Sequence, residues 1–236
     1  MPATEGIRLA ELMAALSQAT DIGLGTAPEH AQRSALVAVA LADAAGLGLD
    51  EARQAFYLTL LKTVGCTGDE DMSARIFGED AGTWIAHLGG ASPVEALRTV
   101  VTNVGRSAPA LRRARKVLRA LGTLPRMPTV SRGHCEVGHL LAQRLGLSSE
   151  VVRGMNQVFE RWDGQGAPAR LKGEAIDRAV RVAQLAADAQ AAQRMLGSEG
   201  SVAPLRKRSG RGYDPKLVDV FCRRAPQLLE FASSRS

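Results

Sequence analysis

Residues 159–168 read Phe-Glu-Arg-Trp-Asp-Gly-Gln-Gly-Ala-Pro, and this stretch constrains the fold more than any other part of the chain. Gly164 and Gly166, followed by Pro168, cannot lie inside a helix, because glycine weakens a helix and an interior proline breaks it. The runs on either side, 151–159 and 175–192, carry apolar residues at helical spacing. The stretch is therefore predicted to be a shaped loop between two helices.

Helical spacing of apolar residues recurs along the chain, whereas period-two alternation, the mark of a half-buried strand, is not evident. Only 4% of the residues are aromatic against 45% hydrophobic, so the core must consist mainly of leucine, valine and alanine. Both observations favour packed helices and predict an all-α protein with one domain spanning residues 1–236. The helices are expected at 6–18, 28–46, 51–63, 93–104, 109–121, 133–145, 149–160, 174–194, 199–208 and 215–223, with a connector at 124–132.

Charge and cysteine content narrow the function classes. Thirty basic residues against 24 acidic ones give a net charge of +6, which admits an anionic partner. The excess is mostly arginine in an alanine-rich chain, so contact with nucleic acid is not expected. No apolar run reaches the roughly 18 residues of a membrane span, and the N-terminus lacks the pattern of a signal peptide. Three widely spaced cysteines favour reduced thiols, and a cytoplasmic protein without membrane contact is predicted.

The stretch 159–168 resembles the signature of the HD-GYP phosphohydrolases, metal enzymes that open cyclic dinucleotides. Their motif has two histidines, Glu, two variable residues, Asp-Gly, one variable residue and Gly-Tyr-Pro. Here the tyrosine is replaced by Ala167, and the histidines by Val158 and Phe159. We call the matching residues, together with a tryptophan that is expected to be buried as an anchor, the signature loop: Glu160, Trp162, Asp163, Gly164, Gly166 and Pro168.

The resemblance covers residues 20–66 and 130–223 and implies an HD-domain-like helical bundle. The signature loop is then expected to pack against the helix that starts near Gly133, and Asp163 to cap backbone N–H groups in an Asx-type turn. The block 67–130 departs from the family pattern and is expected to form an inserted helical subdomain over the former site. The family's ligand positions define a remnant pocket, namely His30, Lys62, Thr63, His134, Val158, Phe159 and Ala187.

The remnant pocket has lost most of the family's metal ligands. Lys62 stands in place of a histidine, and an ammonium group repels a divalent cation. Asp188 falls one position after the family's last aspartate, about 100° around a helix. A phosphohydrolase site with two or three metals needs several histidines and carboxylates that converge. We therefore expect no enzyme activity, no cofactor and no bound metal, with His30 and His134 as weak metal candidates only.

The main hypothesis is a catalytically inactive HD-GYP-like module with a regulatory, sensory or protein-interaction role in bacterial signalling. It resembles the sensory halves of LuxR-type regulators. Two alternatives stay open: a metal-dependent cyclic-dinucleotide phosphodiesterase with a non-standard site, and a nucleotide receptor without hydrolysis. The expected partner is another protein or a second copy of the chain, and a nucleotide is the candidate ligand. Cys66 and Cys135 adjoin former ligand positions, which also leaves open a thiol sensor.

Overall fold

The computed structural model describes residues 9–23, 27–62, 64, 93–106, 108–123 and 127–234. Within these ranges the protein is built from helices, and the one β-type pairing is an isolated bridge between Ser209 and Tyr213. The all-α prediction is confirmed. The elements are α1 (Leu9–Gly23), α2 (His30–Ala44), α3 (Leu49–Leu61), α6 (Pro93–Asn103), α7 (Ala110–Thr123), α8 (Met127–Arg144), α9 (Ser149–Met155), a short 3-10 turn (Gly173–Ala175), α10 (Arg178–Lys207) and α11 (Pro215–Ser233).

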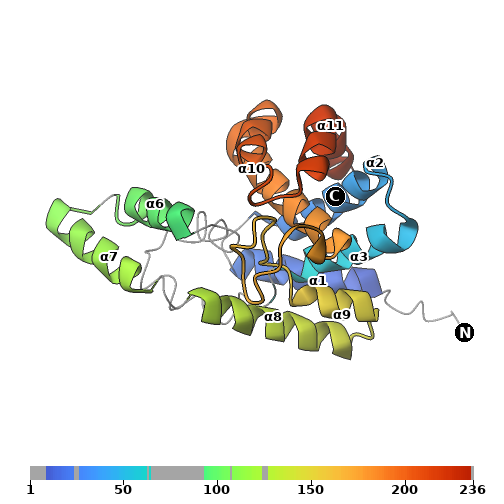
Figure 1. Ribbon diagram of the computed structural model, residues 1–236, viewed down its shortest axis with the longest axis horizontal. Helices are drawn as coiled ribbons and strands as arrows, with labels where there is room; N and C mark the ends of the chain where they lie inside the picture. Colours follow the sequence, from blue (N-terminus) through green and yellow to red (C-terminus); the bar gives the residue numbers. More distant parts are fainter. Residues whose placement is uncertain are drawn as a thin grey trace, which may run out of the picture.

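Helix α2 lies at the centre of the core and packs against α1, α3, α10 and α11. Its small apolar residues are fully buried, among them Ala35, Val37, Ala38 and Leu41. Helix α3 contacts α10 on one side and α9 on the other. In Figure 1, α10 and α11 lie above α2 and α3, and α8 and α9 lie below them. Alanine-rich helices can approach closely, which explains how a chain with so few aromatics forms a core.

Two glycines permit the close packing of α9. A Cβ atom on Gly154 would come within 2.9 Å of the Leu58 side chain of α3. A Cβ atom on Gly138 of α8 would lie 2.4 Å from the end of the Met155 side chain. These contacts hold the start of the signature loop, which follows α9 directly, against α3 and α8.

Several helix boundaries differ from the predicted ones, mostly at prolines. The predicted connector 124–132 is wrong from residue 127 onward, because Pro128 lies in the first turn of α8, where a missing N–H costs no hydrogen bond. Helix α11 continues past Pro226 to Ser233, since its last turns bury Leu228 and Leu229. The predicted break between the helices 174–194 and 199–208 is confirmed, because α10 consists of two helices that meet at a kink at Gly197, where φ is 74°; the first of them begins at Arg178, later than predicted.

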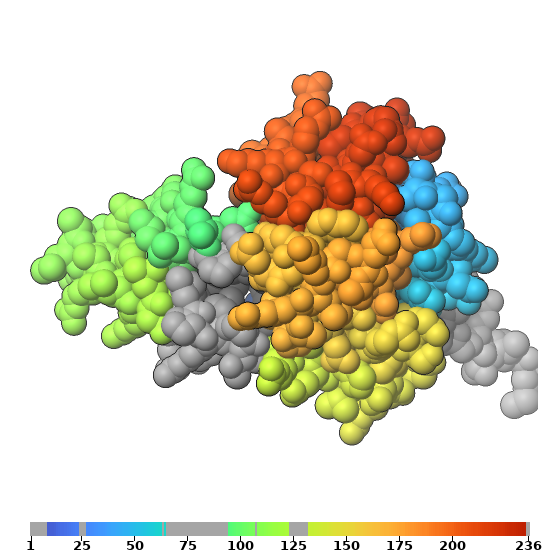
Figure 2. Space-filling model, viewed as in Figure 1, coloured from blue at the N-terminus to red at the C-terminus, as the bar shows by residue number. Residues whose placement is uncertain are grey.

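Helices α6 and α7 extend to one side of the bundle, as Figures 1 and 2 show in green. They pack against each other through Val100, Val104 and Ala120, which are fully buried. Both lie in the predicted inserted segment 67–130. Residues 67–92 are outside the described part of the chain, so the inserted subdomain stays a prediction.

None of the helices in the described ranges is both long enough and apolar enough to cross a membrane.

Candidate functional site

The signature loop is shaped by hydrogen bonds from two buried side chains. The Gln184 amide of α10 donates to three backbone carbonyls, at 3.2 Å from Gln157, 3.2 Å from Val158 and 2.7 Å from Glu160. The Glu160 carboxylate accepts hydrogen bonds from the backbone N–H groups of Ala169 (2.6 Å) and Leu171 (2.9 Å). Burial raises the pKa of Glu160, and these N–H donors offset that effect only in part. Glu160 therefore organises backbone and does not face an open cavity.

Gly166 has a steric role in this loop. A Cβ atom at this position would lie 2.4 Å from the backbone nitrogen of Arg161 and 2.5 Å from the Cα atom of Glu160. Any side chain would push the two arms of the loop apart. The glycine of the motif is thus explained by the loop's own packing.

Asp163 forms the predicted Asx-type turn, because its Oδ1 atom accepts a hydrogen bond from the Gln165 N–H at 3.0 Å. The same carboxylate binds Arg161 through two parallel hydrogen bonds, from Nε at 3.0 Å and from Nη2 at 2.8 Å. Burial raises the pKa of Asp163, but the hydrogen bonds from Arg161 and the Gln165 N–H outweigh it, and the net pKa is lowered. Asp163 is therefore an anion that fixes Arg161.

The prediction of a largely buried Trp162 is only partly correct, since this ring is half-buried. The Arg181 guanidinium lies 5.5 Å above its centroid and shields one face. The buried anchor is the neighbouring Arg161, whose side chain is 2% exposed. The loop backbone is held by the turn before α11, where the Asp163 N–H donates to the Arg211 carbonyl at 2.8 Å. Its link to α8 is a ring contact between Phe159 and His134.

Lys62, one of the residues of the remnant pocket, belongs to an ion-paired cluster. Lys62, just after α3, lies 3.6 Å from Oδ1 of Asp188 on α10. The other carboxylate oxygen of Asp188 accepts hydrogen bonds from Arg208 Nη1, at 3.3 Å, and from the Tyr213 hydroxyl. Arg208 also donates to the Tyr213 oxygen at 2.6 Å.

This cluster extends to the signature loop through Glu95 of α6. Arg161 Nη1 donates to Oε2 of Glu95 at 3.0 Å, and Arg208 Nε lies 3.6 Å from Oε1. We call the connected side chains the charge cluster: Lys62, Glu95, Arg161, Asp163, Asp188, Arg208 and Tyr213.

Burial and charge fix the protonation states in the charge cluster. Burial lowers the pKa of Arg208, but Tyr213, Asp188 and Glu95 outweigh that effect, so its pKa is raised overall. Burial and the Asp188 carboxylate raise the pKa of Tyr213 well above 10.0. The guanidinium therefore stays charged and the phenol stays protonated near neutral pH.

The other predicted pocket residues are more dispersed. His30 is the first residue of α2, and its carbonyl accepts a hydrogen bond from Ser34 Oγ at 2.7 Å. His134 is half-buried, with its ring centroid 6.2 Å from that of Phe159. Both Val158 and Phe159 belong to the hydrophobic core. Ala187 precedes Asp188 on α10 and is half-buried. Thr63 and Cys66 are outside the described residues, and Cys135 is buried.

The described side chains do not fit the metal centre that the resemblance implies. Among these residues there is no group of three or more His, Cys, Asp or Glu that could hold a metal ion. Asp188, which follows a former ligand position, is ion-paired with Lys62 and Arg208, and these two cations oppose the approach of a metal cation. We therefore assign no chemical step to a metal at the charge cluster.

Sequence reasoning missed five members of the charge cluster: Glu95, Arg161, Asp188, Arg208 and Tyr213. Asp188 was expected to point away from the ligand position, because it lies one residue later on the helix. The long Lys62 side chain nevertheless reaches its carboxylate. A usable signal was present, because a lysine at one ligand position and an aspartate beside another are complementary charges. Arg208 and Tyr213 carried no such signal, since only the turn before α11 brings them to Asp188.

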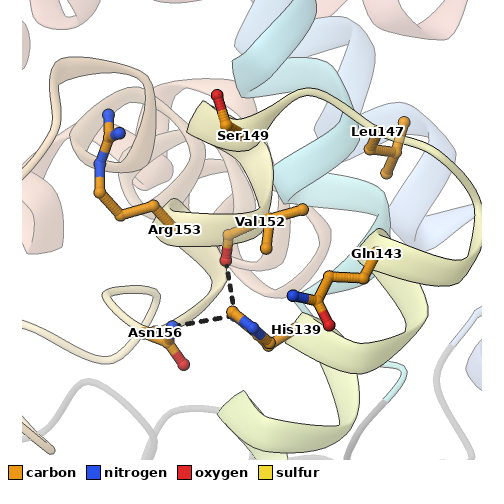
Figure 3. A pocket seen from close by; sticks show the side chains of 7 residues that line it. All are labelled: His139, Gln143, Leu147, Ser149, Val152, Arg153 and Asn156. Atoms are coloured by element: carbon orange, nitrogen blue, oxygen red, sulfur yellow. Dashed lines mark hydrogen bonds between the residues drawn. The ribbon is translucent and has the colours of Figure 1, made fainter.

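A separate surface pocket lies between α8 and α9 (Figure 3), lined by His139, Gln143, Leu147, Ser149, Val152, Arg153 and Asn156. The Nδ1 atom of His139 lies 3.0 Å from the Val152 carbonyl oxygen and 3.0 Å from the Asn156 side-chain nitrogen. Depending on the tautomer, Nδ1 either donates to the Val152 carbonyl or accepts from the Asn156 amide, and in both cases α9 fixes the orientation of the ring. This pocket shares no residue with the charge cluster or the signature loop.

Comparison with known proteins gave three findings. No protein-family model matches the chain. The chain is 29% identical over 218 residues to the 3'3'-cGAMP-specific phosphodiesterase 3 of Vibrio cholerae, a match that covers 90% of this chain and 47% of that protein. A crystal structure of a cyclic GMP-AMP-specific phosphodiesterase of V. cholerae superposes with a TM-score of 0.65 and 28% identity, and it covers 95% of this chain and 50% of the other.

These similarities correct one expectation and support another. The expectation that the chain is not an enzyme is contradicted, because both relatives are phosphodiesterases. That expectation rested on the metal-ligand positions of the HD-GYP pattern, where this chain has Lys62, Thr63, Val158, Phe159 and Ala187. The resemblance to the HD-GYP phosphohydrolases is supported. Over nearly all of its length, this chain is thus similar in sequence and in fold to about half of a cyclic GMP-AMP phosphodiesterase.

Proposed function

We propose that this chain takes part in the hydrolysis of cyclic dinucleotides, of which cyclic GMP-AMP is the first candidate. The observation that carries the proposal is the similarity to a cyclic GMP-AMP phosphodiesterase over 90% of the chain. The substrate of that relative is an anion with two phosphodiester groups, and this chain has a net charge of +6. The reaction class is hydrolysis of a phosphodiester bond, which yields a linear dinucleotide.

The charge cluster is the part of the chain that we assign to the phosphodiester. Negative charge on the phosphoryl oxygens must be neutralised as water attacks, and cations fixed in advance do this most effectively. Lys62 and Arg208 are suited to this role because their side chains are only 16% and 19% exposed and are held by Asp188. The charged Arg208 and the protonated Tyr213 both supply hydrogen-bond donors at neutral pH.

The test is a hydrolysis assay on the purified chain with cyclic GMP-AMP and cyclic di-GMP. Each reaction is run with manganese, with ferrous iron and with a chelator, and the products are separated by chromatography. We expect a linear dinucleotide, and we expect Lys62→Ala to slow its formation by roughly tenfold or more, as loss of a charge-stabilising group does. Lys216→Ala is the matched control, because Lys216 is 84% exposed and pairs with Glu174 away from the charge cluster.

Two results would refute the proposal. One is the absence of product from a folded chain under all three conditions. The other is turnover that Lys62→Ala leaves as fast as Lys216→Ala does, which would remove the charge cluster from the reaction.

The chain spans about half the length of the relatives it matches, 47% and 50%, so the activity of those whole proteins is only proposed for it. As a separate proposal, the chain associates with a protein partner or with a second copy of itself. Light scattering of the active sample should then show a mass above that of one chain, and specific activity should rise with concentration. A monomer with concentration-independent activity would contradict this. A role in bacterial signalling, as in LuxR-type regulators, is compatible with such an activity, because degrading a cyclic dinucleotide ends its signal.

A further inference from the structure

The carboxylate of Glu95 lies between two arginines that come from different parts of the chain. Its Oε2 atom is 3.0 Å from Nη1 of Arg161 in the signature loop, and its Oε1 atom is 3.6 Å from Nε of Arg208 at the end of α10. Glu95 belongs to the first turn of α6. Figure 1 shows this end of α6 facing the loop, while the rest of α6 and α7 extends away.

Each arginine is oriented by another carboxylate and does not depend on Glu95 for its position. Asp163 holds Arg161 through Nε and Nη2, and Nη1 of the same guanidinium donates to Glu95. Asp188 and the Tyr213 oxygen hold Nη1 of Arg208, and its Nε faces Glu95. Two guanidinium groups fixed in this way form a preorganised site for one anion.

The geometry points to a phosphate-binding site formed by Arg161 and Arg208, which Glu95 of α6 occupies as an internal competitor. Guanidinium groups bind carboxylate and phosphate oxygens with the same hydrogen-bond geometry, and phosphate offers more charge and more acceptors. Of these three side chains Glu95 is the most exposed to solvent, at 38%, compared with 2% for Arg161 and 19% for Arg208. The inference rests on the proposed function for the source of the phosphate, a cyclic dinucleotide.

A phosphate that binds both arginines takes the place of the Glu95 carboxylate and so releases the first turn of α6 from the signature loop.

The experiment uses inorganic phosphate as the probe and compares wild type, Glu95→Gln and Glu174→Gln by titration calorimetry. Glu174→Gln makes the same charge change in an exposed pair with Lys216. Removal of the competitor should tighten phosphate binding by roughly tenfold, the scale of one charge-assisted hydrogen bond that is partly exposed. The control should bind phosphate like wild type. A Glu95→Gln protein that folds but binds phosphate no tighter than wild type overturns the inference.

Hydrogen exchange on the wild-type protein gives an independent test that needs no substitution. Saturating phosphate should speed amide exchange in residues 93–103 and leave α9, residues 149–155, unchanged. Phosphate binding without faster exchange in α6 would also overturn the inference. A third arm with cyclic GMP-AMP separates the two proposals. If Glu95→Gln binds phosphate more tightly but cyclic GMP-AMP is neither bound nor cleaved, the phosphate site is supported and the proposed function is rejected. If cyclic GMP-AMP is cleaved but Glu95→Gln binds phosphate like wild type, the proposed function is supported and the phosphate site is rejected.

Discussion

Asp188→Asn should destabilise the protein strongly, because this carboxylate balances three partners in a largely buried place. Lys62 Nζ lies 3.6 Å from one oxygen, and Arg208 and the Tyr213 hydroxyl bind the other. The side chains of Asp188 and Lys62 are 20% and 16% exposed, so solvent screens them little. Asparagine keeps the shape and one acceptor but removes the negative charge that faces both cations.

The size of the effect follows from these contacts. Hydrogen bonds to charged groups contribute about 1.5–3 kcal/mol each, and breaking a buried ion pair costs about 3–5 kcal/mol. Because the lysine contact is long and one acceptor survives, we expect a loss of about 3 kcal/mol in the free energy of unfolding. For a chain of this size that corresponds to a fall in Tm of about 6–12 °C.

The assay is urea denaturation followed by far-UV circular dichroism, with Asp219→Asn as the matched control. Asp219 pairs with Arg223 on the surface of α11, where the two side chains are 63% and 64% exposed. Exposed pairs contribute little, so the control should unfold like wild type. If Asp188→Asn falls within about 0.5 kcal/mol of the control, the usual range for surface substitutions, the charge cluster does not stabilise the fold and the reasoning fails.

Three further predictions concern the signature loop. Asp163 has a lowered pKa, so its contribution to stability is present above its ordinary pKa of 3.8 and is lost as the pH falls toward the lowered value. Asp163→Asn should therefore flatten the pH dependence of the free energy of unfolding in that acid range. An unchanged pH profile would contradict the assignment. Gln184→Leu leaves three carbonyls without their donor and should cost about 2–3 kcal/mol in urea denaturation, and a loss below about 0.5 kcal/mol would show that other donors replace it. Gly166→Ala places a Cβ atom 2.4 Å from backbone and should lower Tm clearly, whereas Gly122→Ala, with nothing within 4 Å of its Cβ, should raise Tm or leave it unchanged; equal Tm values for the two would refute the steric argument.

The sequence by itself determined the fold class and the shape of the central loop. Apolar residues at helical spacing and a core of leucine, valine and alanine permit little besides packed helices. Gly164, Gly166 and Pro168 exclude a helix where the loop lies. The Asx-type turn at Asp163 was also predictable, because an aspartate can bind the backbone two residues on whatever surrounds it. These features depend on local chain geometry, which the sequence specifies directly.

Helix ends at prolines were less predictable, because a proline in the first turn of a helix and one in a connector look alike in sequence. Pro128 begins α8, and Pro226 lies inside α11, where burial of the following leucines compensates for the lost hydrogen bond. The partial burial of Trp162 also depends on tertiary packing, because the position of Arg181 over its ring depends on how α10 packs.

Only the tertiary structure decided the composition of the charge cluster. Asp188 looked misplaced for a ligand, yet it lies within reach of Lys62 because α3 and α10 pack side by side. Glu95 and Arg161 are 66 residues apart in sequence, and Arg208 comes from a third segment. Ion pairs between distant segments depend on how the helices are placed relative to one another. The spacing of residues along the chain does not predict that placement.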